Sequence, residues 1–259
     1  MTKTFLILLL SLLSFVPDDP PYKYGKPTTK GISDYIKTFE YDLVIEFKNY
    51  IKDTILDEAE VWIECDNLSE YTEHDTLELG RFYIPGDVII TNETLFLDYD
   101  INMMSKWKRS QYIETNQFVK ATVMHELTHF YFYMVTLYMK YSKQYVSPEY
   151  KATINLFPYN SQGAEFIEEG VCEYVTVKMG ETIPYKNNYK PVTTREIIEN
   201  RNTHKLKYKY SSFFVKQLLD TVDLRTGIEI LISNSPPSTE EILHPETFYK
   251  RLRYDIPSD

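Results

Sequence analysis

The sequence predicts an α+β fold, in which a small N-terminal antiparallel or mixed sheet precedes a mostly helical part. Two patterns support this. Short segments with alternating apolar residues lie between residues 59 and 97, and from about residue 115 apolar residues recur at helical spacing. The chain of 259 residues, 43% of them hydrophobic, is long enough to bury a core as one medium domain or two small ones.

The first part of the mature chain is predicted to contain one helix and three strands. Residues 33–50 carry a stripe of apolar residues at helical spacing, and Ser33 is a plausible N-cap. The strands are predicted over residues 59–65, 81–84 and 87–97. The segment 88–92 suits an ordinary core strand.

The rest of the chain is predicted to be helical. Residues 115–141 contain no Gly or Pro, and apolar residues on most faces indicate a largely buried helix. A loop over 148–160 separates it from a second helix over 162–179, which Gly180 ends. Shorter helices are predicted over residues 195–200, 208–220, 227–233 and 240–243. The last of these has a capped start at 236–241 and is expected to end at His244.

Residues 1–16 are predicted to be a signal peptide or a short membrane anchor. Lys3 precedes an apolar stretch over residues 5–16, which is too short to span a bilayer as a helix. Residues 17–30 are predicted to be a linker, and residues 31–259 the functional domain. Export would place the domain in a secreted, periplasmic or cell-surface location, where membrane contact would come only from residues 5–16 if they are not removed.

The composition excludes several classes of function. The chain has 38 acidic and 28 basic side chains and a formal charge of −10, which argues against a general nucleic-acid binder. Its 8 Gly residues form no Gly-rich phosphate loop, and its 2 Cys residues cannot build a four-Cys zinc site. A disulfide between Cys65 and Cys172 and two free buried thiols both remain open.

The strongest motif is His125-Glu126-Leu127-Thr128-His129, inside the long predicted helix. Two His residues at positions i and i+4 lie on one helical face, so both imidazoles can reach one metal ion. Glu126 flanks the same face, where its carboxylate can accept a proton from an activated water. The apolar neighbours Val123 and Phe130 make an unpartnered polar pair costly at this place.

A catalytic zinc site needs a third protein ligand, and a carboxylate is the best candidate. Val135 stands where the metzincin pattern has a third His, and the other three His residues, His74, His204 and His244, lack a supporting local pattern. Acidic residues recur every four positions in the second helix, and like charges at that spacing repel one another. These residues are Glu165, Glu169 and Glu173. Glu165 and Glu168 have a simpler explanation, since acidic residues stabilise the first turn of a helix.

Together these residues resemble the gluzincin metallopeptidases. The matching parts are the His125–His129 motif and the Glu169-Gly170 pair in the second helix, and the resemblance covers roughly residues 85–220. It looks most like the aminopeptidase-N and thermolysin-like group. It implies a zincin-like fold with two zinc-binding helices, in which residues 141–160 form an inserted loop. The segment that recognises a free amino terminus is missing, so aminopeptidase specificity is not implied.

The resemblance also implies roles for particular residues. Glu169 would be the third zinc ligand, and Glu173 would orient a ligand histidine. Gly170 would let the two zinc-binding helices approach closely. A tyrosine at the start of the later helix, Tyr208 or Tyr210, would stabilise the developing oxyanion.

The sequence therefore predicts an exported zinc-dependent metallopeptidase that acts on a peptide or protein substrate. His125, His129 and Glu169 would hold Zn²⁺, Glu126 would be the general base, and Tyr208 would assist catalysis. The alternative is a non-catalytic, zinc-binding or envelope-associated protein with a vestigial site. The intact Glu126 argues against that alternative, because a structural zinc site needs no base.

Overall fold

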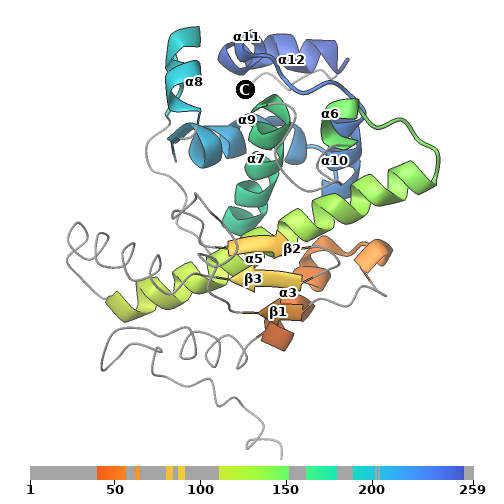
Figure 1. The fold of residues 1–259 in the computed structure, drawn as a ribbon, viewed down its shortest axis with the longest axis vertical. Helices are drawn as coiled ribbons and strands as arrows, with labels where there is room; N and C mark the ends of the chain where they lie inside the picture. The colour runs from red at the N-terminus through yellow and green to blue at the C-terminus, as the bar shows by residue number, and fades with distance from the viewer. Residues whose placement is uncertain are drawn as a thin grey trace, which may run out of the picture.

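The structure is a computed structural model. It describes residues 40–56, 62–64, 80–83, 87–90, 111–151, 162–179, 189–201, 203 and 205–253, and helices form most of this part. The long helix α5 crosses the molecule, and the later helices lie on one side of it (Figure 1). Up to residue 200 the helices are α3 (Glu40–Ile51), the 3₁₀ turn η1 (Thr54–Leu56), α5 (Gln111–Tyr141), α6 (Pro148–Lys151), α7 (Gln162–Lys178) and α8 (Thr194–Asn200). After residue 200 the helices are the π-helix η4 (Lys205–Tyr210), α9 (Ser211–Leu219), α10 (Leu224–Ile232), α11 (Thr239–Leu243) and α12 (Pro245–Arg251). Within the described residues, no helix is both long and apolar enough to cross a membrane.

The predicted α+β fold class is wrong, because the part of the structure that can be interpreted is 77% helical. Among the described residues, strand pairing is limited to three segments of three or four residues, β1 (Trp62–Glu64), β2 (Gly80–Tyr83) and β3 (Asp87–Ile90). In the order β1-β3-β2, β1 runs parallel and β2 antiparallel to β3. Their side chains are not described, so the core of the described part is built by helices. The alternation that predicted a sheet extends over residues 59–97, most of which lie outside the described residues.

Helix α5 forms the centre of the described core, as its sequence predicts. It begins at Gln111, four residues before the predicted start, and ends at the predicted Tyr141. With no Gly or Pro to interrupt it, apolar side chains on several of its faces become buried together. The buried side chains of α5 include Val123, Met124, Leu127, Phe130, Tyr131, Phe132, Val135 and Met139.

Helix α7 packs against α5 on one side and against η4 and α9 on the other (Figure 1). Its bounds match the predicted helix to within one residue. The resemblance implied that Gly170 lets α7 approach α5, but Gly170 faces the start of α9 instead. A Cβ atom at this position would lie 2.6 Å from the backbone oxygen of Ser211, so only glycine permits this approach.

The helix predicted over residues 208–220 is divided into two parts. Residues Lys205–Tyr210 form the π-helix η4, and α9 follows directly. The Ser211 hydroxyl donates a hydrogen bond to the carbonyl of Lys207 and another, 3.1 Å long, to that of Tyr208. Because π-helical turns are rare and occur frequently at functional sites, this segment is a candidate for a function.

The described part of the predicted helix 33–50 is α3, which packs on α5 through the buried side chains of Leu43 and Phe47. Just after α3, the carboxylate of Asp53 joins three parts of the chain. It accepts hydrogen bonds from the Tyr131 hydroxyl at 2.7 Å and from the Arg225 guanidinium at 2.9 Å. This cluster fixes the segment of α3 to α5 and α10.

Three of the later helices, α8, α10 and α11, begin at side-chain caps. Thr193, Asp223 and Ser238 each accept a hydrogen bond from the backbone N–H three residues later. The predicted cap of the helix at 240–243 is confirmed, since Ser238 and Glu241 form a reciprocal capping box. His244 ends α11 as predicted, but Pro245 then begins α12, a helix that the sequence did not predict.

Several predictions concern residues outside the described part of the chain. These are the leader over 1–16, the linker over 17–30, the start of the helix at 33–39, and the residues Cys65, His74, Gly180 and His204. Of the loop predicted over residues 148–160, the first four residues form α6, and residues 152–160 lie outside the description.

Candidate metal centre

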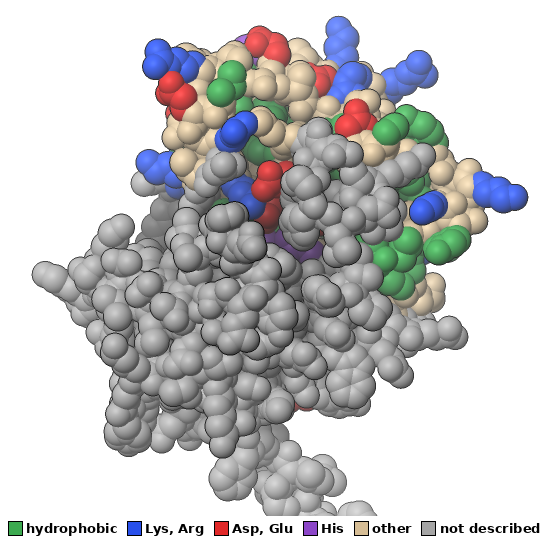
Figure 2. All heavy atoms as spheres, in the orientation of Figure 1, with side chains coloured by type: hydrophobic (Ala, Val, Ile, Leu, Met, Phe, Trp, Pro, Cys, Tyr) green, Lys and Arg blue, Asp and Glu red, His purple; other side chains and the backbone are tan. Residues whose placement is uncertain are grey.

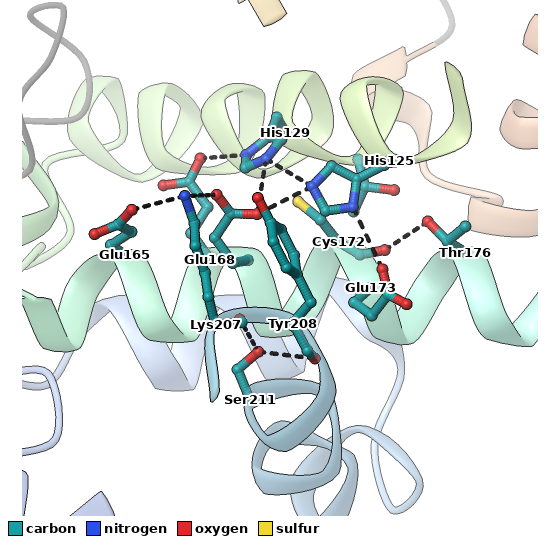
Figure 3. A network of polar contacts seen from close by, with 12 residues as sticks. His125, His129, Glu165, Glu168, Cys172, Glu173, Thr176, Lys207, Tyr208 and Ser211 are labelled. Carbon is teal, nitrogen blue, oxygen red and sulfur yellow. Dashed lines mark hydrogen bonds and ion pairs between the residues drawn. The ribbon is translucent and has the colours of Figure 1, made fainter. Parts of the chain in front are cut away.

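The two histidines of the motif point toward a common place between α5 and α7 (Figure 3). They lie one helical turn apart on α5, with the centroids of the two rings separated by 4.9 Å. Their Nε2 atoms are 3.2 Å apart, and the side chains of His125 and His129 are 14% and 12% exposed. In the space-filling view, histidine, acidic and basic side chains meet at one place on the described helices (Figure 2). The helical spacing therefore produces the paired imidazoles that the sequence predicts.

Helix α7 brings the predicted third ligand, Glu169, to the same place. Its Oε2 atom lies 3.0 Å from the Nε2 of His125 and 3.7 Å from the Nε2 of His129. Glu169 and the two His residues are 40 or more residues apart in the chain, so their meeting depends on the packing of α7 against α5. The structure thus brings these three predicted residues together.

The separations of these three atoms fit a single zinc ion. Zinc binds His nitrogen and carboxylate oxygen at about 2.0–2.2 Å in tetrahedral geometry, so two such ligand atoms lie about 3.3 Å apart. The triangle formed by His125, His129 and Glu169 has sides of 3.2, 3.0 and 3.7 Å. No rearrangement larger than a few tenths of an ångström is needed to hold one ion.

Each histidine also has a carboxylate at its other ring nitrogen. The Nδ1 atom of His129 lies 2.8 Å from Oε1 of Glu168, and the Nδ1 atom of His125 lies 3.8 Å from Oε2 of Glu173. A carboxylate at Nδ1 favours a proton there, which leaves the Nε2 lone pair free to bind a metal ion. The arrangement is the one expected for metal ligands oriented by outer carboxylates.

As a result, three atoms that can bind a metal ion, the two Nε2 atoms and Glu169 Oε2, converge at one place. With protons on both Nδ1 atoms, the two Nε2 atoms and Glu169 Oε2 face one another as lone pairs. Additional protons on the imidazoles would let them donate hydrogen bonds to Glu169 Oε2, and a divalent cation would compete with those protons for the same atoms. A single divalent cation would satisfy all three, because each would become a ligand.

Cys172 is a group at this site that the sequence analysis did not assign to metal binding. It is free and fully buried, and its Sγ forms with the ring nitrogens of His125 and His129 a group whose atoms lie within 4.8 Å of one another. This group could hold a metal ion. Its position three residues after Glu169, on the same face of α7, is the signal that could have revealed it.

Glu168 was assigned to the helix dipole, but its main partner is His129. The carboxylate is buried, and its second oxygen, Oε2, has no hydrogen-bond partner among the described residues. A favourable charge at the start of α7 does not require such burial. The contact with His129 at 2.8 Å therefore explains the position of Glu168 better than the dipole does.

Lys207 is a second residue that the sequence analysis did not include. Its Nζ atom lies 2.9 Å from Oε1 of Glu165 and 3.0 Å from Oε1 of Glu169. The lysine comes from η4 and reaches over α7 toward the site (Figure 3). Nothing in the local sequence signals this contact, because it depends on the π-helical turn that orients the side chain.

Of the two tyrosines considered for oxyanion stabilisation, only Tyr208 is at the site. Its ring lies edge-on to His125, with centroids 5.8 Å apart. Burial and the charge of Glu169 raise the pKa of Tyr208 well above its usual value, so its phenol stays protonated. Tyr210 is buried elsewhere and donates a 2.9 Å hydrogen bond to the carbonyl of Ile242. The structure therefore places Tyr210 in the core and away from the histidines.

The charges of the site are strongly coupled. Burial alone would lower the pKa of His125, but hydrogen bonds with Glu169 and Glu173 outweigh it and raise the pKa to about 9. Burial would raise the pKa of Glu169, yet the two histidines and Lys207 hold it well below its usual value. Burial raises the pKa of the Cys172 thiol to about 12. Glu169 is thus a carboxylate, while Cys172 needs a bound cation to become a thiolate.

Two further predicted residues differ in their relation to the site. Glu126 is buried on α5, and its charge contributes to the raised pKa of Tyr208, which places both groups in one electrostatic environment. His244 is about half exposed and pairs with Glu240 at 3.4 Å and Glu246 at 3.5 Å. It is therefore a surface residue beside α12, as the lack of a local pattern suggested.

A comparison of the chain with known protein families, with curated proteins and with solved structures finds no match. The resemblance to gluzincins therefore stays a prediction from the motif residues.

Proposed function

We propose that this protein is a zinc-dependent hydrolase that cleaves peptide bonds. The observation that carries the proposal is the convergence of three acceptor atoms, from His125, His129 and Glu169, at separations of 3.0–3.7 Å. This set of two imidazoles and one carboxylate matches the catalytic zinc sites that keep a position open for water. When bound, the zinc ion would polarise the scissile carbonyl and lower the pKa of a water molecule toward 7.

The remaining steps are assigned to side chains of the chain itself. Glu126 would accept the proton of the attacking water and pass it to the departing amine, as a buried carboxylate next to the ligand His125 can do. Tyr208 would donate a hydrogen bond to the developing oxyanion, which its raised pKa and its contact with the His125 ring support. Glu168 and Glu173 would hold the ligand histidines in the tautomer that binds the ion.

The peptide substrate and the location are proposed from the sequence. The peptide bond as the target follows from the resemblance of the motif residues to gluzincins, and the substrate would be a peptide or a protein. The apolar leader over residues 1–16 favours an exported protein that is secreted, periplasmic or held at the cell surface.

The test combines metal analysis with one substitution. Purified protein should contain about one zinc per chain, and it should cleave a mixture of quenched fluorescent peptides. Glu126→Gln should retain the zinc and lose roughly 10²- to 10⁴-fold in cleavage rate, the usual contribution of a general base. Glu199→Gln, at an exposed position on α8, is the matched control and should change neither property. Undiminished cleavage by Glu126→Gln would contradict the assignment.

A second candidate function is a non-catalytic zinc protein, and the position of Cys172 favours it. If its thiolate became a fourth ligand, the site would be closed, as structural zinc sites are. Cobalt substitution separates the two cases, since a cobalt–thiolate bond gives a charge-transfer band that Cys172→Ser would remove. A closed site predicts this band together with no peptide cleavage. An open site predicts cleavage, no such band, and little effect of Cys172→Ser on the rate.

A further inference from the structure

The two oxygens of Glu169 have different partners. Oε2 faces His125 at 3.0 Å, on the side where the metal ligands converge, whereas Oε1 faces Lys207 at 3.0 Å. The carboxylate is buried, with its side chain only 8% exposed, so water does not compete freely for either oxygen. Each oxygen therefore has a fixed role in the structure.

We propose that Lys207 is a positioning residue that keeps Glu169 bound to the metal through one oxygen only. This rests on the proposed zinc site. A carboxylate can bind a cation with one oxygen or with both, and the second oxygen would occupy the position that water and substrate need. With Oε1 paired to an ammonium group, only Oε2 remains for the ion, and the site keeps an open position.

The placement of Lys207 is fixed from three directions. The Nζ atom of Lys207 also contacts Glu165, one helical turn before Glu169, at 2.9 Å. The hydroxyl of Ser211 bonds to the carbonyl of Lys207 and holds the end of η4 in its π-helical turn. Gly170 lets Ser211 approach α7 closely enough for the lysine to reach across. These contacts orient the ammonium group toward Oε1 of Glu169.

A role in simple charge balance would leave a different signature. Lys207 is about three-quarters buried between two acids, so its removal must lower stability in either case. Charge balance alone predicts no change in the geometry of the metal site. A positioning role predicts that the freed Oε1 joins the coordination, which raises the coordination number and slows catalysis at an unchanged metal content.

The experiment compares Lys207→Met, Lys207→Arg and, as a matched control in the same π-helix, the exposed Lys205→Met. Each protein is loaded with Co²⁺ for its visible spectrum and with Zn²⁺ for the kcat and KM of peptide cleavage. Lys207→Met should convert the intense spectrum of four-coordinate cobalt into the weak one of higher coordination. It should also lower kcat by about 10- to 100-fold, the usual effect of losing an outer partner of a metal ligand. Lys207→Arg should restore most of both properties, and Lys205→Met should resemble the wild type.

An unchanged cobalt spectrum and kcat in a folded Lys207→Met protein would overturn the proposal. If that variant does not fold, Glu165→Gln serves instead, because it loosens Lys207 and should shift the spectrum in the same direction by a smaller amount. An unchanged spectrum in Glu165→Gln would then count against the proposal. Failure of the zinc site itself is recognised separately, since the wild-type protein would then take up no metal or cleave no peptide.

Discussion

Two buried polar clusters lie along α5, and they differ in how well they satisfy themselves. In the first, Oδ1 of Asp53 accepts hydrogen bonds from the Ile55 amide at 3.0 Å and from Arg225 at 2.9 Å, and Oδ2 accepts one from Tyr131 at 2.7 Å. Donors and acceptors match, so this cluster is complete. In the second, between α5 and α7, ring nitrogens of His125 and His129 converge with a Glu169 oxygen, and Oε2 of the buried Glu168 has no hydrogen-bond partner among the described residues.

The difference separates a structural network from a binding site. A buried polar group without a partner costs about 1–3 kcal/mol, so a chain keeps such groups only where a ligand supplies what they lack. The Asp53 cluster holds α3 against the rest of the fold and needs nothing further. The His125 cluster instead brings together atoms that a bound cation would hold in place of protons. The predictions below use this contrast.

Removal of metal should give the largest effect, and it should involve only the second cluster. Zinc at about 1,000 times its Kd should raise the free energy of unfolding by about 4 kcal/mol, because the ion binds the folded chain alone. Denaturation with urea, in excess zinc and in excess chelator, measures this increment. His129→Ala should abolish it. An unfolding free energy that is equal with zinc and with chelator would contradict the proposed site.

Asp53→Ala should lower the free energy of unfolding by about 3 kcal/mol, because it leaves the buried Tyr131 hydroxyl and the largely buried Arg225 without their shared acceptor. The loss should be the same with zinc and with chelator, since this cluster does not touch the metal site. Asp42→Ala, at an exposed position on α3, is the control and should change stability by less than about 0.5 kcal/mol. A loss that appears only in the presence of zinc would show that the two clusters are coupled.

The part of the site that lies within one helix could be predicted from the sequence. The spacing of His125 and His129 fixes their shared face because α5 is a regular helix, and no tertiary contact is needed. Glu169 came from the resemblance of its Glu-Gly pair. Cys172 was overlooked although it shares a face of α7 with Glu169, and Glu168 was not recognised because its relation to His129 depends on the rotation of α7 about its axis against α5. That rotation is set by packing between distant segments.

The prediction of the fold from the sequence was limited in the same way, because it succeeded for local patterns and failed for contacts between distant segments. Long segments with helical periodicity, such as α5 and α7, were predicted to within a few residues. The sheet was predicted from short alternating segments, which carry a weaker signal, and it led to the wrong fold class. The end of a helix at His244 was predicted, but the new helix α12 that Pro245 begins directly after it was not, because proline is compatible with both the end and the start of a helix. Lys207 was missed because a π-helical turn has no clear sequence signature.

The smallest effect should come from two glycines, one near each cluster. A Cβ on Gly170 would lie 2.6 Å from the backbone oxygen of Ser211, which can move only if the start of α9 moves. Gly170→Ala should therefore cost about 2 kcal/mol, and it should weaken zinc binding because Lys207 moves with α9. A Cβ on Gly227, in α10 near Arg225, would meet the Cδ2 atom of Leu219 at 2.3 Å.

The Cδ2 atom of Leu219 is the end of a flexible side chain, which can rotate away from a Cβ on Gly227. In addition, alanine stabilises a helix relative to glycine by about 1 kcal/mol. Gly227→Ala should thus change stability by less than about 1 kcal/mol and leave zinc binding unaltered. Urea denaturation and zinc titration of both variants test the pair. If Gly170→Ala bound zinc as tightly as Gly227→Ala, the close approach of α9 to α7 would have no part in arranging the metal site.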